Sequence, residues 1–335
     1  MKIITKGKNM NNFKKVGLTA LAGSLAAISA NAAEMSVSGA TMLTYTSEDG
    51  SEVTGNPFGM KTNIGFTASG EVNGYTVSYM QTVADQFAGM SSARLSVDMG
   101  DMGTVAFDQG SGSGLGTIDD KTPTAAEEIW DGLDGVTTGG LVGNTGASGV
   151  FNYVNSFNGT TLNAAVRSGS GTKNADGASS GAGGSAWDFA ITTDGSSMGV
   201  DGMTAGVGYG ENEESDTSGS DKDSTVFANY AVGPVTFGAQ FSNLEKGTTA
   251  GTDEQAIAWG IAVNINESLS VSYGEREVEY DKPTSADVTE KGEGVAVAYT
   301  MGSMKIAGNM NEVSDNDGTA GSTDSMTEIA LSFAF

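Results

Sequence analysis

The strongest constraint on the fold of this chain is an alternation of apolar and polar residues that recurs along most of its length. Apolar side chains stand at every second position in short runs, and the runs end at turn signals such as Asn158-Gly159 and Gly233-Pro234. Helical spacing is almost absent. A period of two indicates β-strands with one apolar and one polar face, so the chain is predicted to be all-β.

Sixteen such runs can be counted. They cover residues 35–45, 60–68, 75–79, 93–99, 105–107, 151–153, 162–166, 187–191, 203–209, 226–232, 235–241, 257–263, 269–273, 295–299, 304–310 and 329–335. Tight turns, as at 99–103, 157–159 and 301–304, alternate with polar loops at 169–185, 212–223, 279–291 and 314–323. In a soluble sandwich the apolar faces would pack together, whereas in an outer-membrane barrel they face lipid and the polar faces line water.

Three features favour the membrane barrel over the sandwich. The number of runs is even, and short and long connections alternate, as they do in outer-membrane barrels. Tyrosines stand near strand ends, as an interfacial aromatic girdle requires. These tyrosines are Tyr45, Tyr75, Tyr79, Tyr153, Tyr209, Tyr230, Tyr273 and Tyr299. We therefore expect a 16-stranded antiparallel transmembrane β-barrel.

Composition excludes several classes of function. The 335 residues include no Cys, no His, 16 basic and 41 acidic side chains, with a formal charge of −25. Without thiol or imidazole there is no Cys or His catalysis, no disulfide framework and no common zinc site. The negative charge argues against nucleic-acid binding, which depends on neutralising phosphates. The chain is not expected to be an enzyme.

The N-terminal segment has the three parts of a secretory signal peptide. Five lysines fall within the first 15 residues, an uncharged run follows at 16–28, and Ala30-Asn31-Ala32 supplies a cleavage pattern. We predict that residues 1–32 are removed and that residues 33–335 form a single barrel domain. In that domain no apolar run approaches the ~18 residues of a transmembrane helix, so a spanning structure must be a barrel.

The chain ends on an apolar strand whose final residue is aromatic. Leu331, Phe333 and Phe335 share one parity. In an exported protein this ending looks like the signal that the outer-membrane barrel-assembly machinery reads.

Taken together, these features resemble the Gram-negative general porins across the whole mature chain. Residues 100–107, GDMGTVAF, are similar to that family's turn between the fourth and fifth strands. The resemblance implies an outer-membrane homotrimer of 16-stranded barrels, each a water-filled channel for passive diffusion of small hydrophilic solutes and ions. It also implies that the third long loop folds into the barrel and forms the eyelet.

The matching segment here is the long interruption at 109–148. Loops of this length are uncommon and usually functional. Its acidic residues are Asp119, Asp120, Glu127, Glu128, Asp131 and Asp134. By parity, Lys61, Arg94 and Arg167 point into the lumen, because an Arg or Lys on the lipid face costs roughly 2–4 kcal/mol near the midplane. We expect these bases to face the acidic loop across the constriction, and the excess of acid to give a weak preference for cations.

Other interpretations remain open from the residues alone. One is a substrate-selective outer-membrane channel, although the inward positions are mostly Ser, Thr, Gly and Asn rather than an aromatic path or a basic ladder. Another is a secreted acidic β-rich surface protein or adhesin, which would not need sixteen lipid-facing runs or a terminal Phe. No cofactor is expected. Asp315-Asn316-Asp317-Gly318 lacks the later Glu of a calcium loop, although clustered acids in outer loops could hold Ca²⁺ loosely.

Overall fold

The computed structural model of the chain describes residues 34–48, 55–84, 89–133, 142–143, 148–169, 184–213, 219–248 and 250–335. The predicted signal peptide lies outside these residues. Sixteen strands are present. They are β1 (Glu34–Glu48), β2 (Phe58–Val72), β3 (Tyr75–Ala84), β4 (Gly89–Asp98), β5 (Thr104–Gln109), β6 (Ser148–Phe157), β7 (Thr160–Arg167), β8 (Ala186–Thr193), β9 (Met203–Glu213), β10 (Ser220–Val232), β11 (Val235–Glu245), β12 (Asp253–Asn264), β13 (Leu269–Asp281), β14 (Val288–Met301), β15 (Met304–Ser314) and β16 (Thr323–Ala334).

Four short 3-10 helices lie in the connections that the structure describes. They are η2 (Gly100–Met102), η3 (Gly114–Ile118), η4 (Ser196–Met198) and η5 (Asn316–Gly318). Within the described part of the chain, no helix is long and apolar enough to cross a bilayer.

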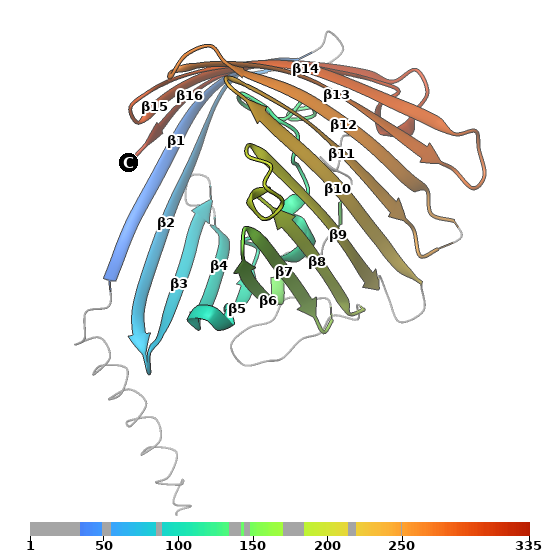
Figure 1. Cartoon of the computed structure of the whole chain (residues 1–335). Helices are drawn as coiled ribbons and strands as arrows, with labels where there is room; N and C mark the ends of the chain where they lie inside the picture. The colour runs from blue at the N-terminus through green and yellow to red at the C-terminus, as the bar shows by residue number, and fades with distance from the viewer. Residues whose placement is uncertain are drawn as a thin grey trace, which may run out of the picture.

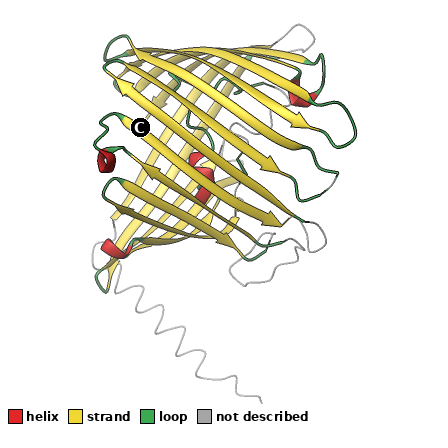
Figure 2. Ribbon diagram, turned by 45° about the vertical axis from the view of Figure 1, so that its right-hand side comes forward, coloured by secondary structure: helices red, strands yellow, loops and turns green. Residues whose placement is uncertain are grey.

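The strands form one closed antiparallel barrel in which each pairs with its neighbours in sequence (Figures 1 and 2). Closure joins β1 to β16, with Leu43 opposite Leu331 and Thr41 opposite Phe333. The backbones of Gly39 and Phe335 exchange two hydrogen bonds of 3.2 and 2.8 Å at this seam. The predicted fold class and strand number are therefore confirmed.

The two faces of the wall differ as the alternation predicts. Apolar side chains such as Phe151, Val297 and Met310 point outward, and they are 57%, 45% and 59% exposed. Their neighbours in sequence point inward. On β14, for example, Ala296 and Ala298 are 8% and 3% exposed. A wall with an apolar outside and no apolar layer over it is stable only where hydrocarbon covers it.

The turns at one end of the barrel are short because their residues suit tight hairpins. Asn73-Gly74 and Asn158-Gly159 all have positive φ, between 49° and 84°. Positive φ at both central residues is the conformation of a type I′ turn, for which Asn-Gly is the preferred pair. We call this the turn end of the barrel and the opposite one the loop end.

At the loop end the strands run further than the apolar runs predicted. The sequence places loops at 279–291 and 212–223, whereas β13 continues to Asp281, β14 starts at Val288, and β9 and β10 extend to Glu213 and from Ser220. Outward-facing Glu275 and Glu277 of β13, beyond Tyr273, keep the same parity as the apolar residues. The apolar pattern ends where lipid contact ends, while backbone pairing between strands continues.

Candidate constriction of the barrel lumen

The long loop, residues 110–147 between β5 and β6, is held at its start by polar side chains of the inner wall. Asp108 Oδ1 accepts the backbone N–H of Ser111 at 2.9 Å. Asn163 Oδ1 accepts that of Gly114 at 2.8 Å, and Asp188 Oδ1 that of Leu115 at 3.0 Å. These acceptors come from β5, β7 and β8. Asn163 and Asp188 satisfy the N-terminal amides of η3, and all three acceptors fix the direction in which the loop leaves the wall.

Apolar contacts inside the barrel hold the next part of the loop. Leu115 and Ile118 of η3 form a cluster with Val142, Ala190 and Phe227, and all five are nearly fully buried. Deleting a large side chain from such a cluster costs about 2–5 kcal/mol. This anchor therefore fixes η3 against the wall of β8 to β10.

The loop then crosses the inner wall and binds one strand after another. Gln240 of β11 donates to the carbonyl of Ile118 at 2.8 Å and accepts the N–H of Lys121 at 2.7 Å. Asn229 of β10 donates to the carbonyl of Lys121 at 2.7 Å. Further on, Ser272 of β13 accepts the N–H of Ala125 at 2.9 Å.

The tip of the described loop reaches β15 and β16. Asn311 of β15 donates to the carbonyls of Glu128 and Asp131 at 3.0 and 2.9 Å. Leu133 packs with Val313 and Met326. Trp130 lies against Arg276 of β13, with 5.2 Å between the guanidinium carbon and the ring centroid, a cation–π contact. Because every one of these wall positions faces inward, residues 111–133 lie along the inner wall from β5 to β16.

The acidic side chains of the loop form two neighbouring groups, Asp119 with Asp120 and Glu128 with Glu127 and Asp131. Burial, together with the adjacent charge of Asp120, raises the pKa of Asp119 to about 6. Burial also raises the pKa of Glu128, and Asp120, Glu127 and Asp131 add to this effect. The loop therefore carries a connected set of acidic side chains, and Lys121 pairs with one of them, Asp120, at 3.4 Å. Asp134, also predicted for the constriction, lies outside the described residues.

A wall residue that sequence reasoning missed joins this set. Glu328 of β16 faces inward, where Thr46 donates to its carboxylate at 3.5 Å. Glu127 and Asp131 act electrostatically on Glu328, and Lys61 acts with the opposite sign. The parity of Ile329 and Leu331 was available in the sequence and places Glu328 inside, but nothing local indicates that the loop tip ends beside it.

The three predicted basic residues all face inward, in different surroundings. Lys61 of β2 is exposed and lies near Glu328. Arg94 of β4 donates to Asn152 and, at 3.2 Å, to the carbonyl of Gly112. It thus supports the start of the loop rather than facing the acids across the lumen, which departs from the expected arrangement.

Arg167, at the loop end of β7, donates to Asn212 Oδ1 of β9 at 2.9 Å. Like Arg94, it is held by a neighbouring wall side chain. Of the three bases, Lys61 is the one that lies in electrostatic range of the acidic set. That all nine predicted residues line the narrowest section of the channel stays a prediction.

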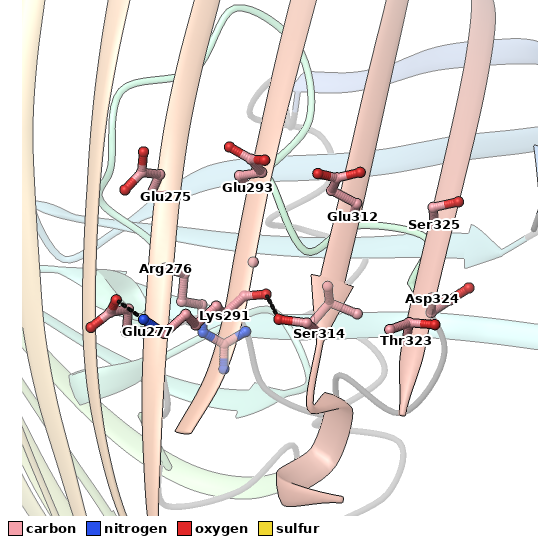
Figure 3. Close-up of a pocket in the computed structure, with 12 residues that line it drawn as sticks. Glu275, Arg276, Glu277, Lys291, Glu293, Glu312, Ser314, Thr323, Asp324 and Ser325 are labelled. Carbon is pink, nitrogen blue, oxygen red and sulfur yellow. Dashed lines mark hydrogen bonds and ion pairs between the residues drawn. The ribbon is translucent and has the colours of Figure 1, made fainter. Parts of the chain in front are cut away.

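A hollow of about 600 Å³ lies along β13 to β16 and is lined mainly by outward-facing side chains (Figure 3). Glu275, Glu293 and Glu312 form one row of side chains there. In the neighbouring row, Lys291 pairs with Glu277 at 3.1 Å. Tyr273 donates to Glu275 and to Glu293, at 2.6 Å each. Beyond Tyr273, toward the loop end, carboxylates replace apolar residues on the outer face. Tyr273 therefore marks the boundary of the apolar belt, as interfacial tyrosines do. Within the described residues no group of three or more acidic side chains could hold a metal ion.

Comparison with known proteins agrees with this geometry. A family model described as Gram-negative porin matches residues 17–335. The chain belongs to the Gram-negative porin family. No curated protein sequence matches it significantly.

Solved structures share the fold of this porin at low sequence identity. A loop-deletion mutant of OmpT from Vibrio cholerae matches with a TM-score of 0.68 and 14% identity, covering 91% of this chain and 100% of that one. An anion-selective porin from Comamonas acidovorans matches with a TM-score of 0.62 and 12% identity, with the same coverage. In-vitro folded OmpT in a trimer form matches with a TM-score of 0.65 and 12% identity, again over 91% and 100%. These similarities show the fold.

Family and fold together establish the general role of this porin. It is a multi-pass β-barrel of the outer membrane and forms a channel for passive diffusion. The sequence prediction of family, location and channel function is confirmed.

Charge on the long loop is expected to depend on pH near neutrality. Because the pKa of Asp119 is raised to about 6, its carboxyl is mostly protonated below that pH and charged above it. Any attraction of the loop for cations should therefore increase between about pH 5 and about pH 7.5. Reversal potentials in planar bilayers at the two pH values would measure this, and Asp119→Asn should flatten the difference. An equal pH response in the variant would contradict the assignment to Asp119.

Proposed function

We propose that this porin passes small hydrophilic solutes and ions and weakly prefers cations. The observation that supports this is the position of Glu328, whose carboxylate lies within electrostatic range of Glu127 and Asp131 of the long loop. Wall and loop thus contribute the same sign of charge to one part of the lumen, where Lys61 acts on Glu328 and Lys121 pairs with Asp120 at 3.4 Å.

The physical reason is the potential inside a confined aqueous path. Acidic side chains around such a path lower the potential, which raises the local concentration of cations. Water fills the lumen and screens the charges, with a Debye length of about 8 Å at 0.15 M salt. The preference should therefore be modest and should weaken as salt rises.

We infer that the protein acts without catalysis, because selection by size and charge requires only the lined channel. A homotrimer is the proposed assembly, supported by the trimer form of OmpT, which shares this fold. The barrel-assembly machinery is the proposed partner during biogenesis, with Leu331, Phe333 and Phe335 as its signal. Loose Ca²⁺ binding by acidic outer loops stays a prediction.

A salt gradient across a planar bilayer tests the preference. Purified porin should show stepwise insertion of open channels, and its zero-current potential in asymmetric KCl should have the sign of cation selectivity. Raising the salt on both sides at a constant ratio should reduce that potential. A zero-current potential of the opposite sign would contradict the proposal, while channel steps in the same recording would leave the diffusion function intact.

A further inference from the structure

Four glycines on consecutive strands lie side by side on the inner wall. Gly238 of β11 pairs with Gly260 of β12, which pairs with Gly274 of β13, which in turn pairs with Gly294 of β14. All four stand at inward-facing positions, between outward residues such as Phe237 and Val295. We call them the glycine strip.

An asparagine follows the strip at each end, in the same register. Asn229 of β10 pairs with Gly238, and Asn311 of β15 pairs with Gly294. Both amides donate to backbone carbonyls of the long loop. Asn229 binds the carbonyl of Lys121, and Asn311 binds those of Glu128 and Asp131. The loop is thus fixed at both ends of the strip.

Between the two asparagines, the loop occupies space that wall side chains would otherwise fill. A Cβ on Gly260 would meet the carbonyl of Pro123 at 2.6 Å. One on Gly274 would lie 3.1 Å from Ile129 Cγ2, and one on Gly294 would lie 3.0 Å from the same atom. Carbon atoms in contact normally stand 3.5–4.0 Å apart, so a side chain at these positions would displace the loop.

We propose that the glycine strip and its two asparagines set how closely the long loop lies to the wall, and thereby the open cross-section of the channel. Protein interiors are close-packed, so a loop seated on a bare wall cannot absorb an added side chain without moving. The wall blocks movement outward, and the remaining direction is toward the lumen. The strip residues are positioning residues that act through the loop. The proposal rests on the diffusion-channel function.

Gly294→Val is the direct test, because its Cβ would meet the loop through Ile129 and the side chain of Asn311. We expect a lower single-channel conductance and a shift of the polymer exclusion limit toward smaller polyethylene glycols. Gly294→Ala should shift both in the same direction by less, and it carries the test if the valine variant does not yield a folded barrel. Heat-modifiable migration on gels would confirm that each variant is folded.

Two further variants separate loop displacement from a general defect. Gly292→Val lies on the same strand and the same face, but a Cβ there would meet only the carbonyl of Glu312, at 3.7 Å. Its conductance should equal that of the wild type. Ile129→Gly, added to Gly294→Ala, should restore part of the conductance, because it removes both Ile129 atoms, Cβ and Cγ2, that the new Cβ meets.

The proposal is overturned if Gly294→Ala and Gly294→Val, both folded, conduct as the wild type does. It is also overturned if Gly292→Val lowers conductance equally, or if Ile129→Gly leaves the Gly294→Ala conductance unchanged. Absence of channel steps with the wild-type protein would instead count against the channel function itself.

Discussion

Val297→Arg is expected to lower the free energy of unfolding by about 2–4 kcal/mol, the cost of an Arg at the lipid-facing midplane of a barrel. Val297 points outward and is 45% exposed in the absence of lipid. It stands on β14 between Tyr299, toward the turn end, and Val295. A guanidinium there has no aqueous side within easy reach. Denaturant unfolding of the protein in lipid vesicles measures the loss.

Ser270→Arg is the matched control for this substitution. Ser270 lies on the neighbouring strand, pairs with Ala298 and faces the lumen, where it is partly exposed. The same guanidinium at this site meets water, so stability should change by about 0.5 kcal/mol or less. Equal destabilisation by both variants would show that the outer face of β14 does not contact hydrocarbon.

The triple variant Glu127→Gln, Asp131→Asn and Glu328→Gln is expected to abolish the cation preference. Its three carboxylates are the members of the acidic set that act on one another at the loop tip and on β16, and the amides keep size and polarity. With the charges removed, Lys61 is left without these opposing charges. The permeability ratio of K⁺ to Cl⁻ should fall to near one or below, measured as the zero-current potential in a KCl gradient.

An equal change of charge on the outside provides the control. Glu275→Gln, Glu293→Gln and Glu312→Gln remove three carboxylates from the outer face of β13 to β15 (Figure 3). Because these groups lie outside the lumen, the zero-current potential should stay close to that of the wild type. If the outer triple variant changed selectivity as much as the inner one, net charge rather than lumen geometry would control it.

The strands could be predicted from the sequence because each carries its own signal. Alternation places a residue inside or outside without reference to any other strand, so Lys61, Arg94 and Arg167 were all assigned correctly to the inner face. The same argument located the long loop, since it interrupts the alternation. What alternation does not contain is the relation between strands far apart in sequence.

The parts of the site that escaped prediction all depend on that relation. Arg94 was expected across the lumen from the acids, but β4 lies beside β5, where the long loop begins, and the guanidinium binds Gly112 instead. Glu328 is separated from Asp131 by most of the chain. The glycine strip becomes visible only when three registers are known together, because a single inward glycine has no distinctive neighbours.

The seam between β1 and β16 has a consequence for folding. Leu43 and Leu331 are among the most distant pairing partners in the chain, and their contact requires nearly the whole polypeptide to be in place. Contacts of such sequence separation form slowly because of the entropy of closing so large a loop. Until residues 323–335 dock, two edges of the sheet carry unpaired amides and carbonyls that hydrocarbon cannot solvate. Pairing of β16 with β1 is therefore the step that completes the barrel. A truncation that removes β16 leaves an open sheet rather than a smaller pore.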